Sequence, residues 1–145
     1  MNKQRNLLSL VVVPLATLIL ASCGGTIEDD YQIKGQPYTL EEVEGSKVLK
    51  VTLTKSAEER LGIETAPVQE TGSKLVVPYD AVYLDSHGKF WVYTNPEPQV
   101  FVRAPIHIVR ETSTEAILGK GPSSGTQVVT VGVPELYGTE TEWGT

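Results

Sequence analysis

The sequence predicts a mainly β fold, a small β-barrel or β-sandwich with one short helix. Residues 49–53 alternate between apolar and polar side chains, which is the period of a half-buried strand. After Ser73 the chain reads as short apolar runs separated by turn residues, and many short strands with regular turns are typical of barrels and sandwiches. Only residues 56–61 show a helical pattern, with Ala57 and Leu61 one turn apart.

The first elements follow in order from Lys47. After the strand at 49–53, either Thr54 or Ser56 can cap the short helix, because hydroxyl side chains accept hydrogen bonds from free amides at a helix start. Gly62 is expected to end that helix, since glycine readily adopts the left-handed conformation that closes many helices. Residues 63–68 are expected to be extended again.

The second half of the chain is expected to be β throughout. Residues 75–84 read as one strand, with Pro78 placed as at a sheet edge or bulge. The turn residues 85–88 then predict a hairpin with residues 90–93. Further along we expect a turn at 95–98, a long strand at 100–108, strands at 115–119 and 127–131, and a loop at 120–125 between these last two.

The N-terminus has the pattern of an export signal. Lys3 and Arg5 precede the apolar run Leu7–Leu20, which is shorter than the roughly 20 residues that span a bilayer and contains a proline. The run ends in Leu-Ala-Ser-Cys, which resembles the bacterial lipobox. This resemblance implies a lipoprotein whose signal peptide, residues 1–22, is removed, and whose Cys23 bears thioether-linked diacylglycerol and further acyl chains such as palmitate.

Three further segments follow the signal. Residues 23–46 are acidic and poor in apolar side chains, so we interpret them as a flexible tether, with a short strand around Tyr38–Leu40 as the competing interpretation. Residues 47–138 form the predicted β domain, and residues 139–145 a polar tail. The expected location is therefore a cell membrane, with the domain lipid-anchored on the extracytoplasmic side, in the periplasm or at the cell surface.

The charge balance limits the partners. Of the 12 basic residues, Lys3 and Arg5 lie in the signal. The rest of the chain therefore has 10 basic and 18 acidic residues, a formal net charge of −8. Nucleic acid binding requires a basic face, so nucleic acid is not an expected partner. Cys23 is the only cysteine and there are two histidines, which excludes a thiolate zinc site; neither a metal nor a cofactor is expected.

No catalytic constellation stands out, and we expect a protein that is not an enzyme. His87 is predicted to be a solvated turn residue. His107 is predicted to be a surface residue on the same strand face as Arg103, with no serine or cysteine partner evident for a triad. Trp91 and Tyr93 alternate with Phe90 and Val92, so one pair is expected in the core and the other at the surface. If exposed, Trp91 or Tyr83 would anchor a protein contact.

Several phrases occur in an order that resembles periplasmic adaptor subunits, the membrane fusion proteins of RND-type efflux pumps. The phrases are Val-Thr-Leu-Thr at 51–54, Leu-Gly-Ile-Glu-Thr-Ala-Pro-Val at 61–68, Val-Pro-Tyr-Asp-Ala-Val at 77–82, Gly-Lys-Phe-Trp-Val-Tyr at 88–93, and Gly-Thr-Gln-Val-Val-Thr-Val-Gly at 125–132, with Leu136 close behind. Together they cover about residues 47–138. The resemblance implies the membrane-proximal β domain of an adaptor, the part that contacts the inner-membrane transporter.

The chain departs from that family at one place. Full adaptors carry a lipoyl-like domain and a helical hairpin between the early and late phrases, whereas only residues 69–73 stand between Val68 and Lys74 here. The resemblance therefore implies a lipid-anchored accessory subunit that docks on a membrane transporter or a full-length adaptor, with self-association also open, and that reaches no outer-membrane duct. The alternatives are a small solute-binding lipoprotein and a structural envelope lipoprotein.

Overall fold

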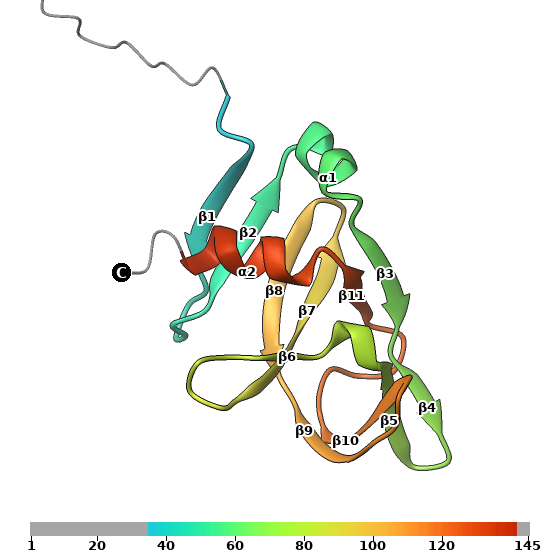
Figure 1. Cartoon of the computed structure of the whole chain (residues 1–145). Coiled ribbons are helices and arrows are strands. Elements are labelled where there is room, and N and C mark those ends of the chain that lie inside the picture. Colours follow the sequence, from blue (N-terminus) through green and yellow to red (C-terminus); the bar gives the residue numbers. More distant parts are fainter. Residues whose placement is uncertain (1–34, 142–145) are drawn as a thin grey trace, which may run out of the picture. The chain divides into compact units, whose positions relative to one another are not determined.

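A computed structural model describes residues 35–141 of the chain, which belong to one compact unit. The predicted signal peptide, Cys23 and most of the tether lie outside the described residues. Neither helix in the described part is long and apolar enough to cross a membrane. The fold is mainly β, as predicted, and it consists of two open antiparallel sheets and two short α-helices (Figure 1).

The larger sheet has the strand order β1-β2-β8-β7-β11-β3, and β6 pairs with β7. β6 and β11 share one edge of β7, because β8 occupies the other edge. The strands are β1 (Tyr38–Glu42), β2 (Leu49–Leu53), β3 (Glu64–Pro67), β6 (Tyr83–Leu84), β7 (Phe90–Glu97), β8 (Val100–Pro105) and β11 (Gln127–Val131).

The smaller sheet has the order β4-β5-β10-β9. Its strands are β4 (Gln69–Thr71), β5 (Lys74–Pro78), β9 (His107–Glu111) and β10 (Glu115–Lys120). The β4–β5 hairpin turns at Gly72, whose φ of 65° is a left-handed conformation that glycine adopts without strain. A 3₁₀ turn, η1 (Tyr79–Ala81), connects β5 to β6 and thus links the two sheets.

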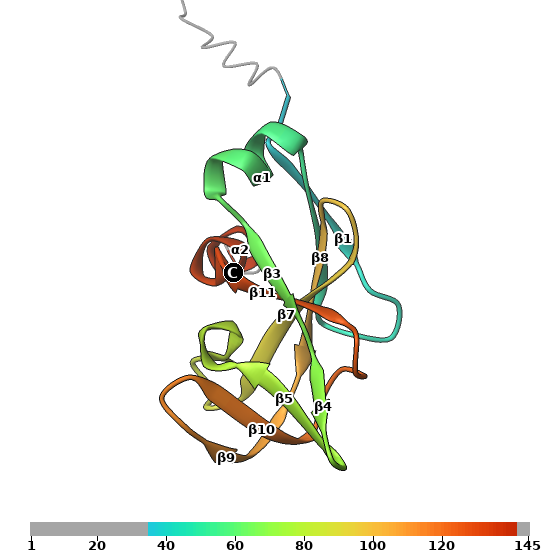
Figure 2. The same ribbon diagram turned by 90° about the vertical axis from the view of Figure 1, so that its right-hand side faces the viewer.

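The helices are α1 (Lys55–Leu61) and α2 (Val133–Thr141). α1 ends as predicted at Gly62, whose φ is 61°. Of the two possible caps, Thr54 is the one used, because its Oγ1 accepts from the Ala57 amide at 3.2 Å. α2 was not predicted. It lies across β2 and β8 on one face of the larger sheet, and the turned view shows it on that face (Figures 1 and 2).

Two apolar clusters lie on opposite faces of the larger sheet. One lies under α2 and contains Val51, Leu53, Ala57, Tyr93, Phe101, Val129, Val133 and Leu136. The other faces the smaller sheet and contains Val68, Val77, Ala81, Val92, Ile106, Ala116, Leu118 and Val128. Consecutive residues of β7 and β11 enter different clusters, because successive side chains of a strand point to opposite faces. Val92 and Tyr93 are therefore both fully buried.

Two predicted strands are interrupted. The run 75–84 leaves the smaller sheet at Pro78, where η1 places Ala81 in the core before β6 begins. The run 100–108 leaves the larger sheet at Pro105, which has no amide hydrogen to donate. Ile106 donates instead to the Phe90 carbonyl at 3.0 Å, and the chain continues as β9 in the other sheet.

The predicted turn at 95–98 begins too early. Residues 95–97 remain in β7 across a register shift between Thr94 and Glu97, and the chain reverses at Pro98 and Gln99. The Asn95 side chain accounts for the difference, because its Nδ2 donates to the carbonyls of Glu97 and Val100. The asparagine thus supports the bulge instead of forming the turn.

The domain bounds also differ from the predicted ones at both ends. Tyr38–Glu42 form β1, paired with β2, so the competing interpretation of a strand near Tyr38 is the one the structure shows. At the other end Thr139–Thr141 belong to α2, and Glu140 is only 3% exposed. The folded part thus extends beyond residues 47–138 on both sides.

Candidate functional site

A buried carboxylate, Glu140, joins α2 to the larger sheet. Its Oε1 accepts from Arg103 Nε at 2.9 Å and from the Leu49 backbone amide at 3.1 Å. Its Oε2 accepts from the Tyr93 hydroxyl at 2.6 Å. These three donors come from β8, β2 and β7, so a single side chain connects the last turn of the helix to three strands.

The local sequence places Glu140 on the buried face of α2. Val133, Leu136 and Glu140 are spaced i, i+3 and i+7, which puts them on one side of a helix. The first two pack into the cluster under α2, and the carboxylate reaches the polar end of Tyr93. This spacing is the sequence signal from which the burial of Glu140 could have been predicted. Pro134 and Gly138 made the helix itself hard to predict, because proline and glycine are unfavourable in a helix interior.

Arg103 is held from two sides. Its guanidinium carbon lies 4.6 Å from the centre of the Trp91 ring, a cation–π distance, and its Nε is bound by Glu140. The Arg103 side chain is 17% exposed, so water only partly screens the pair with Glu140. The ion pair and the cation–π contact together restrain the Arg103 side chain beside the indole.

Trp91 is in turn fixed by the β6–β7 turn. Its Nε1 donates to Asp85 Oδ2 at 2.9 Å, while Asp85 Oδ1 accepts from the amides of His87 and Lys89. The Lys89 amide is the strongest influence that lowers the pKa of Asp85 below its ordinary value, and the hydrogen bonds from Trp91 and His87 act in the same direction. Asp85 is therefore ionised at neutral pH.

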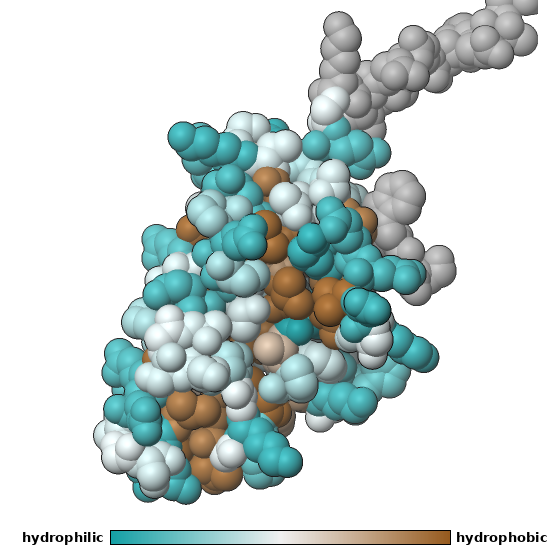
Figure 3. All heavy atoms as spheres, turned by 180° about the vertical axis from the view of Figure 1, so that it is seen from behind, coloured by the Kyte–Doolittle hydropathy of each residue, from teal (hydrophilic) through white to brown (hydrophobic). Residues whose placement is uncertain are grey.

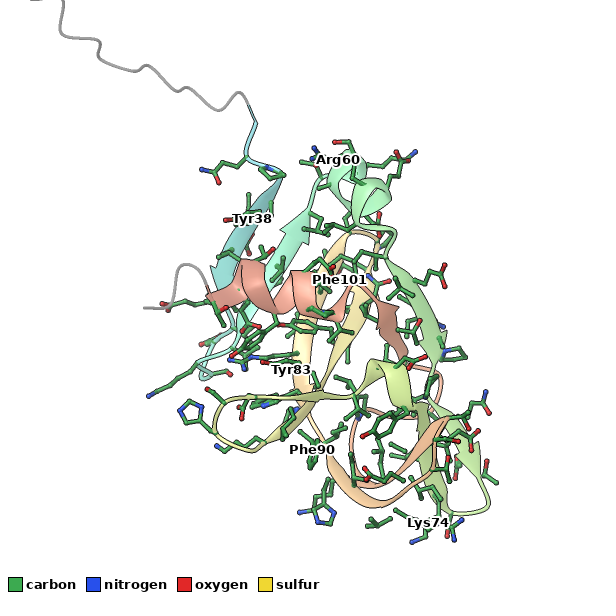
Figure 4. The ribbon with its side chains drawn as sticks, in the orientation of Figure 1. Tyr38, Arg60, Lys74, Tyr83, Phe90 and Phe101 are labelled. Carbon is green, nitrogen blue, oxygen red and sulfur yellow. The ribbon has the colours of Figure 1, made fainter. Side chains whose placement is uncertain are left out.

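Two tyrosines, Tyr83 and Tyr137, pack against each other, and a third, Tyr93, binds Glu140. The rings of Tyr83 and Tyr137 are 4.3 Å apart between centroids, and Figure 4 shows Tyr83 below α2. Burial, followed by the neighbouring Tyr137, raises the pKa of Tyr83. Burial also raises the pKa of Tyr93, with the hydrogen bond to Glu140 as the next cause. The phenols of Tyr83 and Tyr93 consequently remain neutral, and Tyr93 remains a donor to Glu140.

Asp85, Trp91, Arg103 and Tyr137 border an open cleft of about 530 Å³, which we call the Arg103 cleft. It lies between the β1–β2 connection, the β6–β7 turn and the end of α2. Its lining residues are Ser46, Lys47, Val48, Asp85, His87, Lys89, Trp91, Arg103, Tyr137 and Thr141.

The structure places the predicted site residues as follows. Cys23 lies outside the described residues. His87 is exposed in its turn, as predicted, and His107 is exposed on β9. His107 does not share a strand face with Arg103, because the chain changes sheets between them. Within residues 35–141 no group of acidic, histidine or cysteine side chains is arranged to hold a metal ion.

The structure places a serine hydroxyl beside His87. Ser86 Oγ lies 3.4 Å from His87 Nδ1. The two residues are adjacent and exposed, and the separation is long for a hydrogen bond that involves a hydroxyl. This geometry does not hold a serine in position for nucleophilic attack.

The aromatic prediction was wrong in its pairing. We expected Trp91 and Tyr93 to share one environment and Phe90 and Val92 the other. Tyr93 and Val92 are both buried, whereas Phe90 and Trp91 are half-buried. The reason is that both faces of β7 are covered at its centre but not at its start.

Comparison with known proteins found no match. No family model, no curated protein and no solved structure is similar to this chain.

Proposed function

We propose that the protein is a lipid-anchored, non-enzymatic accessory subunit that docks on a membrane transporter of the cell envelope, in the manner of the membrane-proximal domain of an efflux adaptor. One observation carries the proposal. The early and late phrases that resemble adaptors form neighbouring antiparallel strands, β3 and β11, with Ala66 opposite Val128. The resemblance implies a domain built from both ends of an adaptor chain, and this pairing fits that construction.

The junction between the two halves supports docking without bridging. Residues 69–73, where full adaptors carry their inserted modules, form β4 and the start of a tight turn that leads into β5. A helical hairpin needs two helices of several turns, and five residues that belong to a β-hairpin leave no room for it. The docked subunit would therefore stay near the membrane that holds its lipid.

The exposed features suggest where docking takes place. The β6–β7 turn and the loop at 120–125 both lie at the surface. Among large apolar residues, Leu84 of β6 and Val109 of β9 are 53% and 49% exposed. Seen from behind, apolar residues also gather at the lower end of the domain, where the smaller sheet lies (Figure 3). Exposed apolar residues grouped in this way are typical of interaction surfaces.

Photo-crosslinking in native membranes tests the proposal. We expect a photoreactive amino acid at His87 or Ser123 to capture a membrane transporter or an adaptor, and not an outer-membrane duct. Both positions are exposed, so the replacement should not disturb the fold. Repeated recovery of no transport component would contradict docking and would favour the solute-binding or structural lipoprotein.

The anchor is tested by the same assay. Cys23→Ala should reduce capture without unfolding the domain, because the lipid raises the local concentration at the membrane. Replacing the lipid of this variant by an unrelated membrane-spanning helix should restore capture. Mass spectrometry of the wild-type protein should find diacylglycerol on Cys23, and an unmodified thiol there would refute the lipoprotein assignment.

A further inference from the structure

The Arg103 cleft has an excess of positive charge that the rest of the chain lacks. The whole sequence carries a net charge of −6, yet Lys47, Lys89 and Arg103 line this one cleft. Among the described residues, Asp85 is the one acidic side chain that lines it, and the buried Glu140 lies behind Arg103 as its ion-pair partner.

Both anionic groups already have partners. Asp85 accepts from Trp91 and from two amides of its own turn, and Glu140 accepts from Tyr93, Leu49 and Arg103. By contrast, neither Lys47 nor Lys89 is in an ion pair within the described residues. The cationic side of the cleft thus remains available to a ligand.

Arg103 is pre-organised for binding an oxyanion. Glu140 binds only its Nε, and no acceptor for its two terminal nitrogens is found among residues 35–141. The guanidinium carbon also lies 4.6 Å from the centre of the Trp91 ring, so a second contact restrains the side chain. A planar guanidinium with free terminal nitrogens matches the two oxygens of a carboxylate or phosphate, and side chains fixed in advance lose less freedom on binding.

The walls add an apolar component. Val48, Trp91 and Tyr137 border the same cleft as the cations. Its volume, about 530 Å³, lies within the usual range of small-molecule sites, which combine apolar walls with a few placed polar groups.

We propose that the Arg103 cleft binds a small anion, with carboxylate or phosphate oxygens on Arg103 and Lys89 and an apolar portion against Trp91 and Tyr137. A soluble organic anion and the headgroup of an anionic lipid share this chemistry. The proposal does not depend on transporter docking, because it concerns a ligand of the isolated protein.

Tryptophan fluorescence provides the test. The chain has two tryptophans, so Trp143→Phe in the full chain leaves Trp91, which lines the cleft, as the only reporter. We expect benzoate or inorganic phosphate to change Trp91 emission in a saturable manner at constant ionic strength, and sodium chloride not to do so. Dihexanoyl phosphatidylglycerol that binds more tightly than both would identify a lipid headgroup, whereas weaker binding would identify a soluble anion; dihexanoyl phosphatidylcholine is the neutral control.

Charge-reversal variants locate the binding. Lys89→Glu should weaken binding by about tenfold, because it places a carboxylate beside the bound oxyanion. Lys74→Glu is the matched control, since Lys74 is an exposed lysine at the β4–β5 turn, away from Tyr83 in Figure 4, and it should change affinity by less than about twofold. Arg103→Lys keeps the charge but removes the planar fork, and it should also weaken binding by about tenfold.

Three results would overturn the proposal. One is the absence of a saturable signal with every anion. The second is an equal loss of affinity in the Lys89→Glu and Lys74→Glu variants, which would show non-specific attraction. The third is undiminished binding by Lys89→Glu and by an Arg103→Lys variant that has kept its fold.

Discussion

Glu140 is the residue on which α2 most depends. A carboxylate at 3% exposure is stable only with hydrogen-bonding partners, and this one has Tyr93, Arg103 and the Leu49 amide. The arrangement also explains how a helix with proline and glycine in its sequence can persist. Its packing face and one buried ion pair offset a poor intrinsic propensity.

Glu140→Gln should destabilise the protein substantially. The amide keeps the shape of the side chain but removes the charge that compensates Arg103, and it brings an NH₂ group close to three donors. We expect a loss of about 2–4 kcal/mol in the free energy of unfolding, measured by urea denaturation.

Glu135→Gln is the matched control for this change. Glu135 lies on the same helix but is exposed, so the same substitution should alter stability by less than about 0.5 kcal/mol. Equal stability of the Glu140→Gln and Glu135→Gln variants would show that the hydrogen bonds and ion pair of Glu140 do not stabilise the fold.

At the scale of elements, local signals predicted local structure. The Gly62 stop and the alternation at 49–53 each act within a few residues, and both predictions were confirmed. Of the two capping residues that the sequence left open, Thr54 is the one that caps the helix. The β6–β7 hairpin was predicted for the same reason, because Asp85 organises its turn through its own neighbours.

The missed features depend on residues that are far apart in the sequence. Tyr93 and Arg103 lie 47 and 37 positions from Glu140, so no pattern along the chain brings them together. The break at Ile106 was missed because its apolar alternation continues through Pro105 without interruption, while the two sheets that receive the halves exist only in the folded molecule. The Arg103 cleft was missed because three separate elements form it.

The β11–α2 connection provides a test at this scale. Gly132 has a φ of 95°, and a Cβ built there would clash with Cδ1 of Ile63. Gly132→Ala therefore meets both a strained backbone and a crowded side chain, and we expect it to lower the free energy of unfolding by about 1–3 kcal/mol. An unchanged free energy of unfolding in Gly132→Ala would contradict this prediction and would mean that the backbone and Ile63 adjust to the added methyl group.

Gly138→Ala in the following helix should have the opposite sign. Its φ is not positive, and a Cβ at Gly138 would meet no neighbouring atom within 4 Å. Alanine is the better helix former, so stability should rise by about 0.5 kcal/mol. Thermal melts of the two alanine variants compare the same substitution in a left-handed connection and in a helix.

At the scale of the folded unit, two clusters share their central strands. Val128 belongs to the cluster that faces the smaller sheet, and Val129 to the cluster under α2. They are consecutive and both fully buried, so neither cluster can lose β11 without disrupting the other. The same holds for Val92 and Tyr93 of β7. We therefore expect the described residues to unfold in one cooperative step.

Truncations in β11 test this coupling. Val128→Ala and Val129→Ala should each lower the free energy of unfolding by about 1–3 kcal/mol, because each removes buried methyl groups. Val131→Ala, at a position that is 44% exposed, is the matched control and should change the free energy of unfolding by less than about 0.5 kcal/mol.

In the Trp143→Phe chain, Trp91 fluorescence reports on the face of β7 that carries Tyr93, whereas circular dichroism reports on both sheets. Because Val128 packs on the opposite face, a coupled fold requires Val128→Ala to shift the Trp91 transition as far as it shifts the dichroism transition. A Trp91 transition that stays in place while the dichroism curve divides into two steps would show that the two faces of the sheet unfold separately.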